Sequence, residues 1–451
     1  MLRKNNIIFL RSKTYFDFIT EYPERILPVT FFLLCLTGGI LLYLPISSPN
    51  GVPFLDALFT SVSGVCVTGL SVIDVGVKLT FIGQVFLILL IQSGGLGIMS
   101  ITSIILILLG KRMSLSQEKT ARNIFDAESK EDIKRSLITI FKYTFIVEAV
   151  GAFILACNFA HTEHNIFTGI GYGIFTSISA FCNAGFFLKG DNLASYYNCP
   201  IITYTVSFLI ILGGMSPFIS ISLQKLFKNK KLPPLSFMVL TTTLILLFGG
   251  ALFFLISEYN GVLSDLTFIE KINNAWFQAT SPRTAGFNTV DLCNINMGTY
   301  ILLITLMIIG GSPGGTAGGI KTSTLAVLIL TCYNSIRGRD NIIRKRNITF
   351  STLQKALTLT IIYLSIIVVA TLMLFTTQSE APHKLAFEVV SALGTVGLSM
   401  GATSSLDSIG KMIIIIVMFL GRVAPATLLC YLNANKTDTK ISYPDAKISL
   451  T

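Results

Sequence analysis

Long apolar runs alternate with short charged stretches along this chain, and the alternation predicts membrane-spanning helices. A helix needs about 20 mostly apolar residues to cross the roughly 30 Å hydrocarbon core of a bilayer. The sequence predicts eight such spans. They are Ile26–Ile46, Leu79–Gly110, Leu137–Ala160, Pro200–Gln224, Leu232–Ser257, Asn296–Ile320, Ala356–Thr377 and Met412–Leu432.

A shorter apolar segment lies between the two spans of each pair and is too short to cross the membrane as a helix. The four segments are Phe54–Ser63, Ile166–Ala180, Trp276–Ala279 with the residues before it, and Leu385–Ala392. Non-helical backbone at membrane depth is tolerated only inside protein or against water. We therefore expect four re-entrant segments that line one interior path.

These segments are copies of one unit. Each ends near a glycine, at Gly69, Gly185, Gly286 and Gly397, with spacings of 116, 101 and 111 residues. A second glycine follows each of them after 25, 28, 24 and 24 residues, at Gly94, Gly213, Gly310 and Gly421. Repetition at a nearly fixed period indicates a repeated structural unit. The predicted fold is an all-α polytopic membrane protein with four parallel span–pore-helix–span repeats around a pseudo-fourfold central pore.

Positive charge gives the expected topology. Of 34 Lys and Arg residues, 26 lie in five stretches, 1–25, 111–142, 225–231, 337–355 and 436–447. Cytoplasmic loops carry such an excess, which places these stretches and both termini on the cytoplasmic side of the cell membrane. The predicted parts are an amphipathic N-terminus (1–24), pore repeat 1 (25–110), a basic loop (111–135), repeat 2 (136–228), repeat 3 (229–336), a basic loop (337–355), repeat 4 (356–432) and a tail (433–451).

Composition excludes several other classes of protein. Hydrophobic residues make up 52% of the chain and charged residues 13%, about half the usual charge of a soluble protein. A disordered chain would be far less apolar. The basic stretches expected in the cytoplasm account for the net charge of +11, so no nucleic-acid partner is expected. Three His and eight scattered Cys without a Cys-x-x-Cys pair argue against a His/Cys metal site.

The four glycine-bearing loops suggest cation chemistry. Rings of backbone carbonyls can replace the hydration shell of a monovalent cation. Glycine permits backbone angles that other residues disfavour, so successive carbonyls can point the same way. The preceding half-helices would add the negative ends of their dipoles. The alternative is that these glycines serve close packing between helices.

At these loops the chain resembles the Trk/Ktr/HKT superfamily of potassium transporters, closest to Ktr-type membrane subunits. The resemblance rests on Phe181–Phe186, Arg283–Asn288, Gly394–Ser399, Gly310–Thr322 and Gly421–Pro425. It implies a homodimer with one pore per subunit, embedded in membrane lipids. It also implies a cytosolic RCK-type nucleotide-binding ring, KtrA-like, so that nucleotide acts only through this partner. No covalently bound cofactor is expected.

The resemblance further implies a selectivity filter for potassium. The implied filter residues are Val67, Thr68, Gly69, Asn183, Ala184, Gly185, Thr284, Ala285, Gly286, Thr395, Val396 and Gly397. Potassium is favoured because Gly69 stands where a serine marks sodium-selective members of the superfamily. A sodium-permeable relative remains the alternative, and coupling of potassium uptake to sodium stays open.

The glycine-rich run within the sixth span is the candidate gate. Six glycines and one proline over Gly310–Thr322 hold a regular helix poorly. The alternative is a simple kink. The predicted gate residues are Gly310, Gly311, Ser312, Pro313, Gly314, Gly315, Thr316, Ala317, Gly318, Gly319, Lys321 and Arg422.

A charge inside a span costs at least about 2.5–3.5 kcal/mol on insertion scales, so Arg422 should face the protein interior. It is therefore assigned to the gate. We expect it to contact gate-loop carbonyls, and the alternative is snorkelling to the inner surface. Lys321 is expected near the cytoplasmic exit. Glu148 is expected to pair with Lys142 or with a neighbouring helix, and its role stays open. Arg283 is expected to brace the third loop through backbone hydrogen bonds, and Cys66 and Cys182 to be packed free thiols.

The chain is not expected to be an enzyme. A membrane-embedded enzyme would need a nucleophile and a base within the spans, but all three histidines lie outside the predicted spans. Two basic regions, Lys111–Arg135 and Arg337–Arg346, are candidates for docking a soluble partner. Contact with lipid headgroups is the equal alternative for both.

Overall fold

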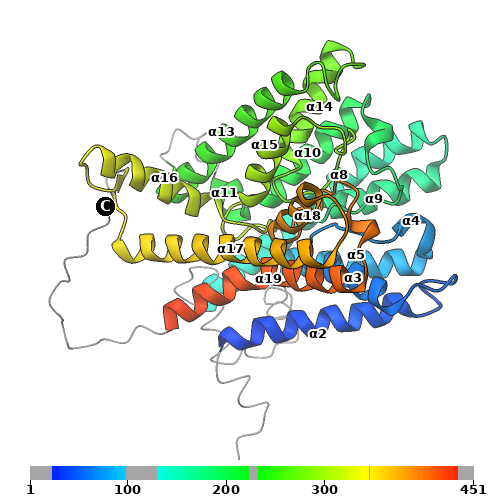
Figure 1. The fold of residues 1–451 in the computed structure, drawn as a ribbon, viewed down its shortest axis with the longest axis horizontal. Coiled ribbons are helices and arrows are strands. Elements are labelled where there is room, and N and C mark those ends of the chain that lie inside the picture. The colour runs from blue at the N-terminus through cyan, green and yellow to red at the C-terminus, as the bar shows by residue number, and fades with distance from the viewer. Residues whose placement is uncertain (1–22, 98–129, 223–231, 345, 435–451) are drawn as a thin grey trace, which may run out of the picture.

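The computed structural model describes residues 23–97, 130–222, 232–344 and 346–434. The predicted amphipathic N-terminus, most of the first basic loop and the C-terminal tail therefore lie outside the described residues. The described part is mostly helical (Figure 1).

The helices fall into four successive groups. The first contains α2 (Pro23–Tyr43), α3 (Phe54–Val65), α4 (Val75–Lys78) and α5 (Phe81–Leu96). The second contains α8 (Lys130–Thr162), α9 (Ile166–Cys182), η1 (Ala194–Tyr196), α10 (Pro200–Gly214) and α11 (Pro217–Ser222). The third contains α13 (Pro234–Ser257), α14 (Phe268–Thr280), α15 (Met297–Ile308) and α16 (Thr322–Ile336). The fourth contains α17 (Phe350–Thr377), α18 (Pro382–Gly394), η2 (Thr403–Ser405) and α19 (Ser408–Ala434).

Local sequence explains where the short helices begin. The Asn165 side chain accepts hydrogen bonds from the first backbone N–H groups of α9. Thr267 and Glu270 form a capping box at the start of α14. Pro382 occupies the first turn of α18, where its missing N–H is harmless. Polar caps thus set the start of α9 and α14, whereas a proline sets the start of α18.

Within the described residues, four helices are long and apolar enough to cross a membrane: Leu137–Thr162, Pro234–Ser257, Phe350–Thr377 and Ser408–Pro425. Between 17% and 44% of the residues in their most apolar windows are buried. Their remaining apolar surface faces outward over whole helix lengths, far beyond what a soluble protein exposes. These helices support a multi-pass membrane protein.

Other predicted spans are shorter or interrupted in the structure. The predicted span Asn296–Ile320 is helical only as α15, which ends at Ile308. The predicted span Pro200–Gln224 breaks after Gly214, and α11 begins again at Pro217. Glycine pairs and proline explain both breaks, because neither residue maintains a helix interior. The first span, expected to reach Ile46, ends at Tyr43.

Two further expectations need correction. A short antiparallel hairpin, β1 (Ile342–Ile343) with β2 (Arg346–Asn347), makes the fold not strictly all-α. His161 lies in the last turn of α8, within the helix long enough to span, and not outside it. It is exposed there, so it forms no buried catalytic group.

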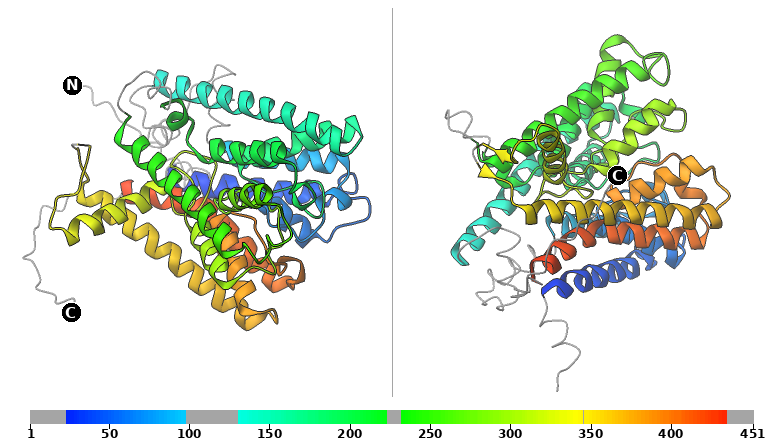
Figure 2. Two further views of the ribbon diagram at one scale, coloured as in Figure 1. Left: turned by 90° about the horizontal axis from the view of Figure 1, so that it is seen from above. Right: turned by 60° about the vertical axis from the view of Figure 1, so that its left-hand side comes forward.

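The last group packs back on the first. In Figures 1 and 2, α2, α19 and α17 run side by side, and α19 contacts both α2 and α3. The Lys411 ammonium on α19 lies 2.6 Å from the Asp56 carboxylate on α3, and both side chains are largely buried. The four groups therefore close on themselves, with the chain ends of the helical region adjacent.

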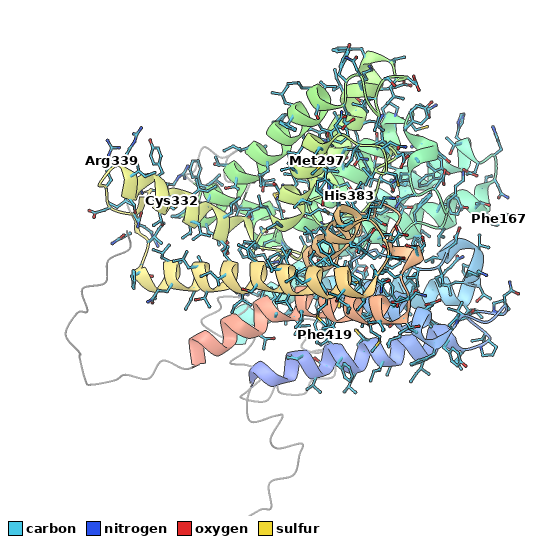
Figure 3. All side chains as sticks on the ribbon, in the orientation of Figure 1. Phe167, Met297, Cys332, Arg339, His383 and Phe419 are labelled. Atoms are coloured by element: carbon cyan, nitrogen blue, oxygen red, sulfur yellow. The ribbon has the colours of Figure 1, made fainter. Side chains whose placement is uncertain are left out.

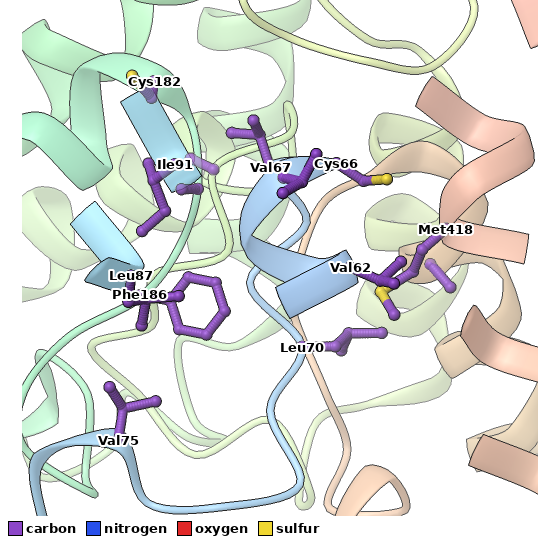
Figure 4. Close-up of a cluster of buried hydrophobic side chains, with 14 of the residues drawn as sticks. Val62, Cys66, Val67, Leu70, Val75, Leu87, Ile91, Cys182, Phe186 and Met418 are labelled. Carbon is purple, nitrogen blue, oxygen red and sulfur yellow. The ribbon is translucent and has the colours of Figure 1, made fainter. Parts of the chain in front are cut away.

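The short helices lie inside this arrangement. Val62, Cys66 and Val67 around the end of α3 belong to the main cluster of buried apolar side chains (Figure 4). Phe186 from the second group and Met418 from α19 belong to the same cluster. The packing of first, second and fourth groups around α3 fixes the loops that follow the short helices.

Candidate functional site: a ring of four glycine loops

Each short helix ends just before one of the four predicted loops, and all four loops share an unusual backbone. Residues at the first loop position have positive φ although they are not glycine: 58° at Val67, 61° at Asn183, 73° at Thr284 and 50° at Thr395. The glycines two residues later also have positive φ: 93° at Gly69, 70° at Gly185, 77° at Gly286 and 94° at Gly397. Left-handed non-glycine residues are uncommon, and the same strained conformation recurs at the same position of all four loops.

The four loops meet in a closed ring. A Cβ built on Gly69 would collide with the carbonyl oxygen of Ala184, and one on Gly185 would lie 2.7 Å from that of Ala285. In the same way Gly286 faces the Val396 carbonyl, and Gly397 faces the Thr68 carbonyl. Each glycine thus touches the middle residue of the next loop, and the fourth loop touches the first. A side chain at any of these four glycines would therefore displace a neighbouring loop.

A serine in each short helix or at its end binds its loop, a regularity that the sequence analysis missed. Ser63 and Ser391 accept hydrogen bonds from the N–H groups of Gly69 and Gly397 at 3.0 and 3.1 Å. Ser179 accepts one from Phe186 N–H at 3.0 Å. Ser281 instead donates to the Phe287 carbonyl. The signal was present, because a serine precedes every loop glycine by five or six residues.

The second set of repeated glycines has a packing role in three groups. A Cβ on Gly94, Gly213 or Gly421 would collide with the carbonyl of Val65, Phe181 or Leu393, respectively. Each of these carbonyls lies near the end of the short helix in its own group. Gly310 differs, since its Cβ would meet the Gly318 carbonyl of the glycine-rich run instead. The third group therefore departs from the pattern at this level.

The glycine-rich run is an ordered non-helical loop between α15 and α16. Ile309 and Ile320 pair in a parallel bridge that closes the loop at its base. Ser312 N–H donates to the Gly214 carbonyl at 2.9 Å, and Thr316 N–H donates to the Gly213 carbonyl at 3.1 Å. The loop therefore lies against the break between α10 and α11. A simple kink does not describe it, because 13 residues separate the two helices.

Two cations hold this loop. Arg422 on α19 donates to the Thr316 carbonyl within the loop and to the Gly94 carbonyl on α5. Its side chain points inward, so it does not snorkel to the surface. Lys321 donates from Nζ to the Ala317 carbonyl at 2.6 Å. The run Gly310–Gly319 with Lys321 and Arg422 is thus one connected unit next to the ring.

The other candidate residues agree with the sequence-based expectations only in part. Arg283 is buried, but its guanidinium reaches the Thr243 hydroxyl at 3.5 Å and no backbone carbonyl among the described residues. Glu148 accepts a hydrogen bond from Gln92 of the neighbouring helix α5 at 3.2 Å, so the helix pairing holds and the Lys142 pairing does not. Cys66 and Cys182 are buried free thiols, as predicted.

Residues 9–436 match the family described as TrkH, cation transport protein. The chain belongs to the TrkH family. The matched residues contain all four predicted repeats, including both the glycine ring and the loop held by Arg422. Family membership therefore agrees with the resemblance drawn from the loop residues.

Curated relatives of similar length agree with this membership. The chain is 36% identical to the potassium/sodium uptake protein NtpJ of Enterococcus hirae, over 95% of this chain and 97% of the relative. It is 35% identical to Ktr system potassium uptake protein B of Vibrio alginolyticus, over 93% of each chain. The protein of the same name from Bacillus subtilis is 34% identical over 94% of this chain and 96% of the relative.

A solved structure supports the fold. The potassium transporter TrkH of Vibrio parahaemolyticus superposes with a TM-score of 0.70 over 91% of this chain and 84% of that one. Sequence identity in this comparison is 18%, so it bears on the fold alone. A mostly helical TrkH-like fold is therefore established for this member of the family.

Proposed function

We propose that this TrkH-family protein is the pore-forming membrane subunit of a potassium uptake system. The names of the relatives motivate the substrate, since three related proteins of matching length are potassium uptake proteins. Cation passage fits the closed ring of glycine loops better than catalysis does. The protein is thus a transporter that moves potassium inward by channel-like permeation.

The single observation that carries the proposal is the ring contact between successive loops. Each loop glycine lies against the middle carbonyl of the next loop, all the way around. Carbonyl rings of this kind replace the water around a dehydrated monovalent cation. In the proposal the short helices act as re-entrant pore helices, and their carboxyl-terminal ends add negative dipole charge at the ring. The ligands are the filter residues named above.

The glycine-rich loop is proposed as the gate of this pore. It contacts the α10–α11 break and is fastened by Arg422 and Lys321. Two positive charges next to a cation path oppose passage while the loop stays in place. A loop with this many glycines can change its backbone angles at little steric cost. Gate opening then requires release of the Arg422 contacts.

Sodium is the second candidate ion. One relative is called a potassium/sodium uptake protein, which motivates a sodium-permeable or sodium-dependent variant of the same pathway. Gly69 in the first loop favours potassium on the resemblance given above. In the proposal potassium is therefore the main cargo, and sodium either stimulates its uptake or competes with it.

The assembly and orientation of the protein are proposed from the same resemblance. The subunit forms a homodimer in the cell membrane, with both termini in the cytoplasm and the four-repeat division given above. Two relatives are named Ktr system potassium uptake protein B, and a lettered protein of a system motivates a separate regulatory subunit. A cytosolic RCK-type ring would bind nucleotide and act on the gate loop from inside.

Rubidium flux into proteoliposomes tests the proposal. Purified protein should give rubidium uptake that potassium inhibits, with sodium and the nucleotide state of a regulatory partner varied independently. Uptake at the level of protein-free vesicles under every condition would remove the transport proposal. Sodium uptake that exceeds rubidium uptake would favour the second candidate.

A further inference from the structure

A basic hairpin follows α16 and precedes α17. We use this name for residues 337–347 apart from residue 345, whose placement is not described. It contains Arg337, Arg339, Arg344 and Arg346 with a single acidic residue, Asp340. All four arginines are exposed. The hairpin lies at one end of the molecule, where Figure 3 labels Arg339, and Phe167 is labelled at the opposite end.

The hairpin is fastened to the ends of helices and does not extend away from them. Arg344 donates to the Leu232 carbonyl just before α13 at 2.7 Å, and its guanidinium lies 4.1 Å from the centre of the Phe237 ring. Arg337 stacks on Tyr333 of α16, at 4.4 Å from the ring centre. These contacts hold the hairpin at the level where α13, α16 and α17 begin or end.

The remaining arginines have no partner in the described part of the chain. No ion pair or side-chain hydrogen bond involves the guanidinium of Arg339 or Arg346 there. Two like-charged groups exposed and unpaired at one site form a surface for an anion. Because both side chains are long and free, they can adapt to a headgroup without disturbing the Arg344 anchor.

Exposed apolar side chains surround these arginines. Ile336 at the end of α16 is 87% exposed, Phe350 at the start of α17 is 71% exposed, and Ile342 in the hairpin is 52% exposed. The apolar surface continues along α17, a helix long enough to span, through exposed Leu357 and Ile361. The charged hairpin is therefore continuous with the membrane-facing surface.

We propose that the basic hairpin binds the headgroups of anionic phospholipids at the membrane surface. Basic side chains beside an apolar face are the composition of interfacial, lipid-binding elements. A soluble protein partner would not require the continuity with the surface of α17. The inference needs only that the protein spans a membrane, so it stands apart from the proposed filter and gate.

Competition between two lipids tests the inference. The full chain in detergent is mixed with equal amounts of phosphatidylglycerol and phosphatidylcholine of identical acyl chains, and retained lipid is counted by native mass spectrometry. Arg339→Gln with Arg346→Gln removes two unpaired charges. Lys78→Gln with Lys189→Gln removes two charges at α4, which contains Lys78 and packs against Leu188, the neighbour of Lys189. Figure 1 shows α4 at the opposite end of the molecule.

We expect the wild type and the Lys78/Lys189 control to retain phosphatidylglycerol preferentially. The Arg339/Arg346 variant should lose about tenfold or more of that preference at low salt, since each basic residue near an anionic surface contributes about fivefold. Raising the salt should reduce the preference of the wild type.

Three results would overturn the inference. One is an undiminished lipid preference in the Arg339/Arg346 variant with unchanged circular dichroism. Another is an equal loss in the Lys78/Lys189 control, which would assign the preference to net charge alone. The third is loss of binding to a soluble regulatory protein while the lipid preference persists, which would assign the surface to that protein.

Discussion

The glycine ring follows the fourfold repeat in all four groups, whereas the neighbouring layer, which contains the glycine-rich loop and Arg422, follows it in only three. In the ring all four groups contribute the same backbone, the same glycine contact and a serine that binds the loop. In the neighbouring layer, a glycine of α5, α10 and α19 packs against a backbone carbonyl near the end of the short helix in the same group. In the third group the glycine-rich loop takes this place. Uniform geometry suits equal coordination of one ion. A single departure suits a part that moves.

The contacts that stabilise the two regions also differ. Ring loops are fixed within their own group, by serine hydrogen bonds and by α-helix ends. The glycine-rich loop is closed at its base by the Ile309–Ile320 bridge, but it is also fixed from outside its own group, by carbonyls of Gly213 and Gly214 and by Arg422 from α19. External contacts can be released without unfolding the loop's own group. This difference predicts that ring substitutions abolish selectivity, whereas loop substitutions change the open fraction.

The largest expected effect comes from the ring. Gly397→Ala places a Cβ against the Thr68 carbonyl at a φ of 94°, where side chains are disfavoured. We expect rubidium uptake to fall to the vesicle background, or rubidium-over-sodium discrimination to fall at least tenfold. Gly171→Ala is the matched control, because a Cβ there meets nothing within 4 Å. Full selectivity in Gly397→Ala would contradict the ring as a filter.

A smaller effect of opposite sign is expected from the loop. Arg422→Gln removes the cation that joins Thr316 to Gly94. The loop should open more often, so that rubidium flux without regulatory partner rises severalfold while selectivity is retained. Arg337→Gln, which removes a surface arginine, is the control. If Arg422→Gln lowered flux and selectivity together, the ring and the loop would not be separate functional layers.

The smallest expected effect is on stability at low pH. It comes from an ion pair outside both the ring and the glycine-rich loop, where no effect on selectivity is expected. Glu163, just beyond the end of α8, accepts hydrogen bonds from Tyr196 and from Lys189, and these contacts lower the pKa of its carboxyl group. Its stabilisation is therefore present above the ordinary glutamate range, near pH 4.3, and is lost as pH falls through the lowered pKa.

Thermal unfolding of Glu163→Gln measures this effect. The melting temperature of the wild type should fall more steeply below about pH 4.3 than that of the variant. The difference should be small, since the pair is partly exposed and screened by solvent. Rubidium selectivity should be the same in both proteins. A change in selectivity would mean that the outer contacts reach the ring.

Much of the fold could be predicted from the sequence because its signals are local and repeated. Apolar runs give helices, and the in-step glycines give the four loops, since positive φ at Gly69 and Gly397 requires glycine. The loss of helix between Ile308 and Thr322 follows from the glycines and proline of this segment. Arg422 inside an apolar run had to find polar partners, because an unpaired charge there is costly.

Tertiary structure alone decided which groups those partners are. The closure of the ring, with Gly397 against Thr68, depends on α19 returning to α2 and α3 across more than 300 residues. Arg283 finds the Thr243 hydroxyl and Glu148 finds Gln92, choices that no local pattern encodes. Periodicity determines which face of a segment is apolar, but the contact between distant segments depends on how all four groups pack together.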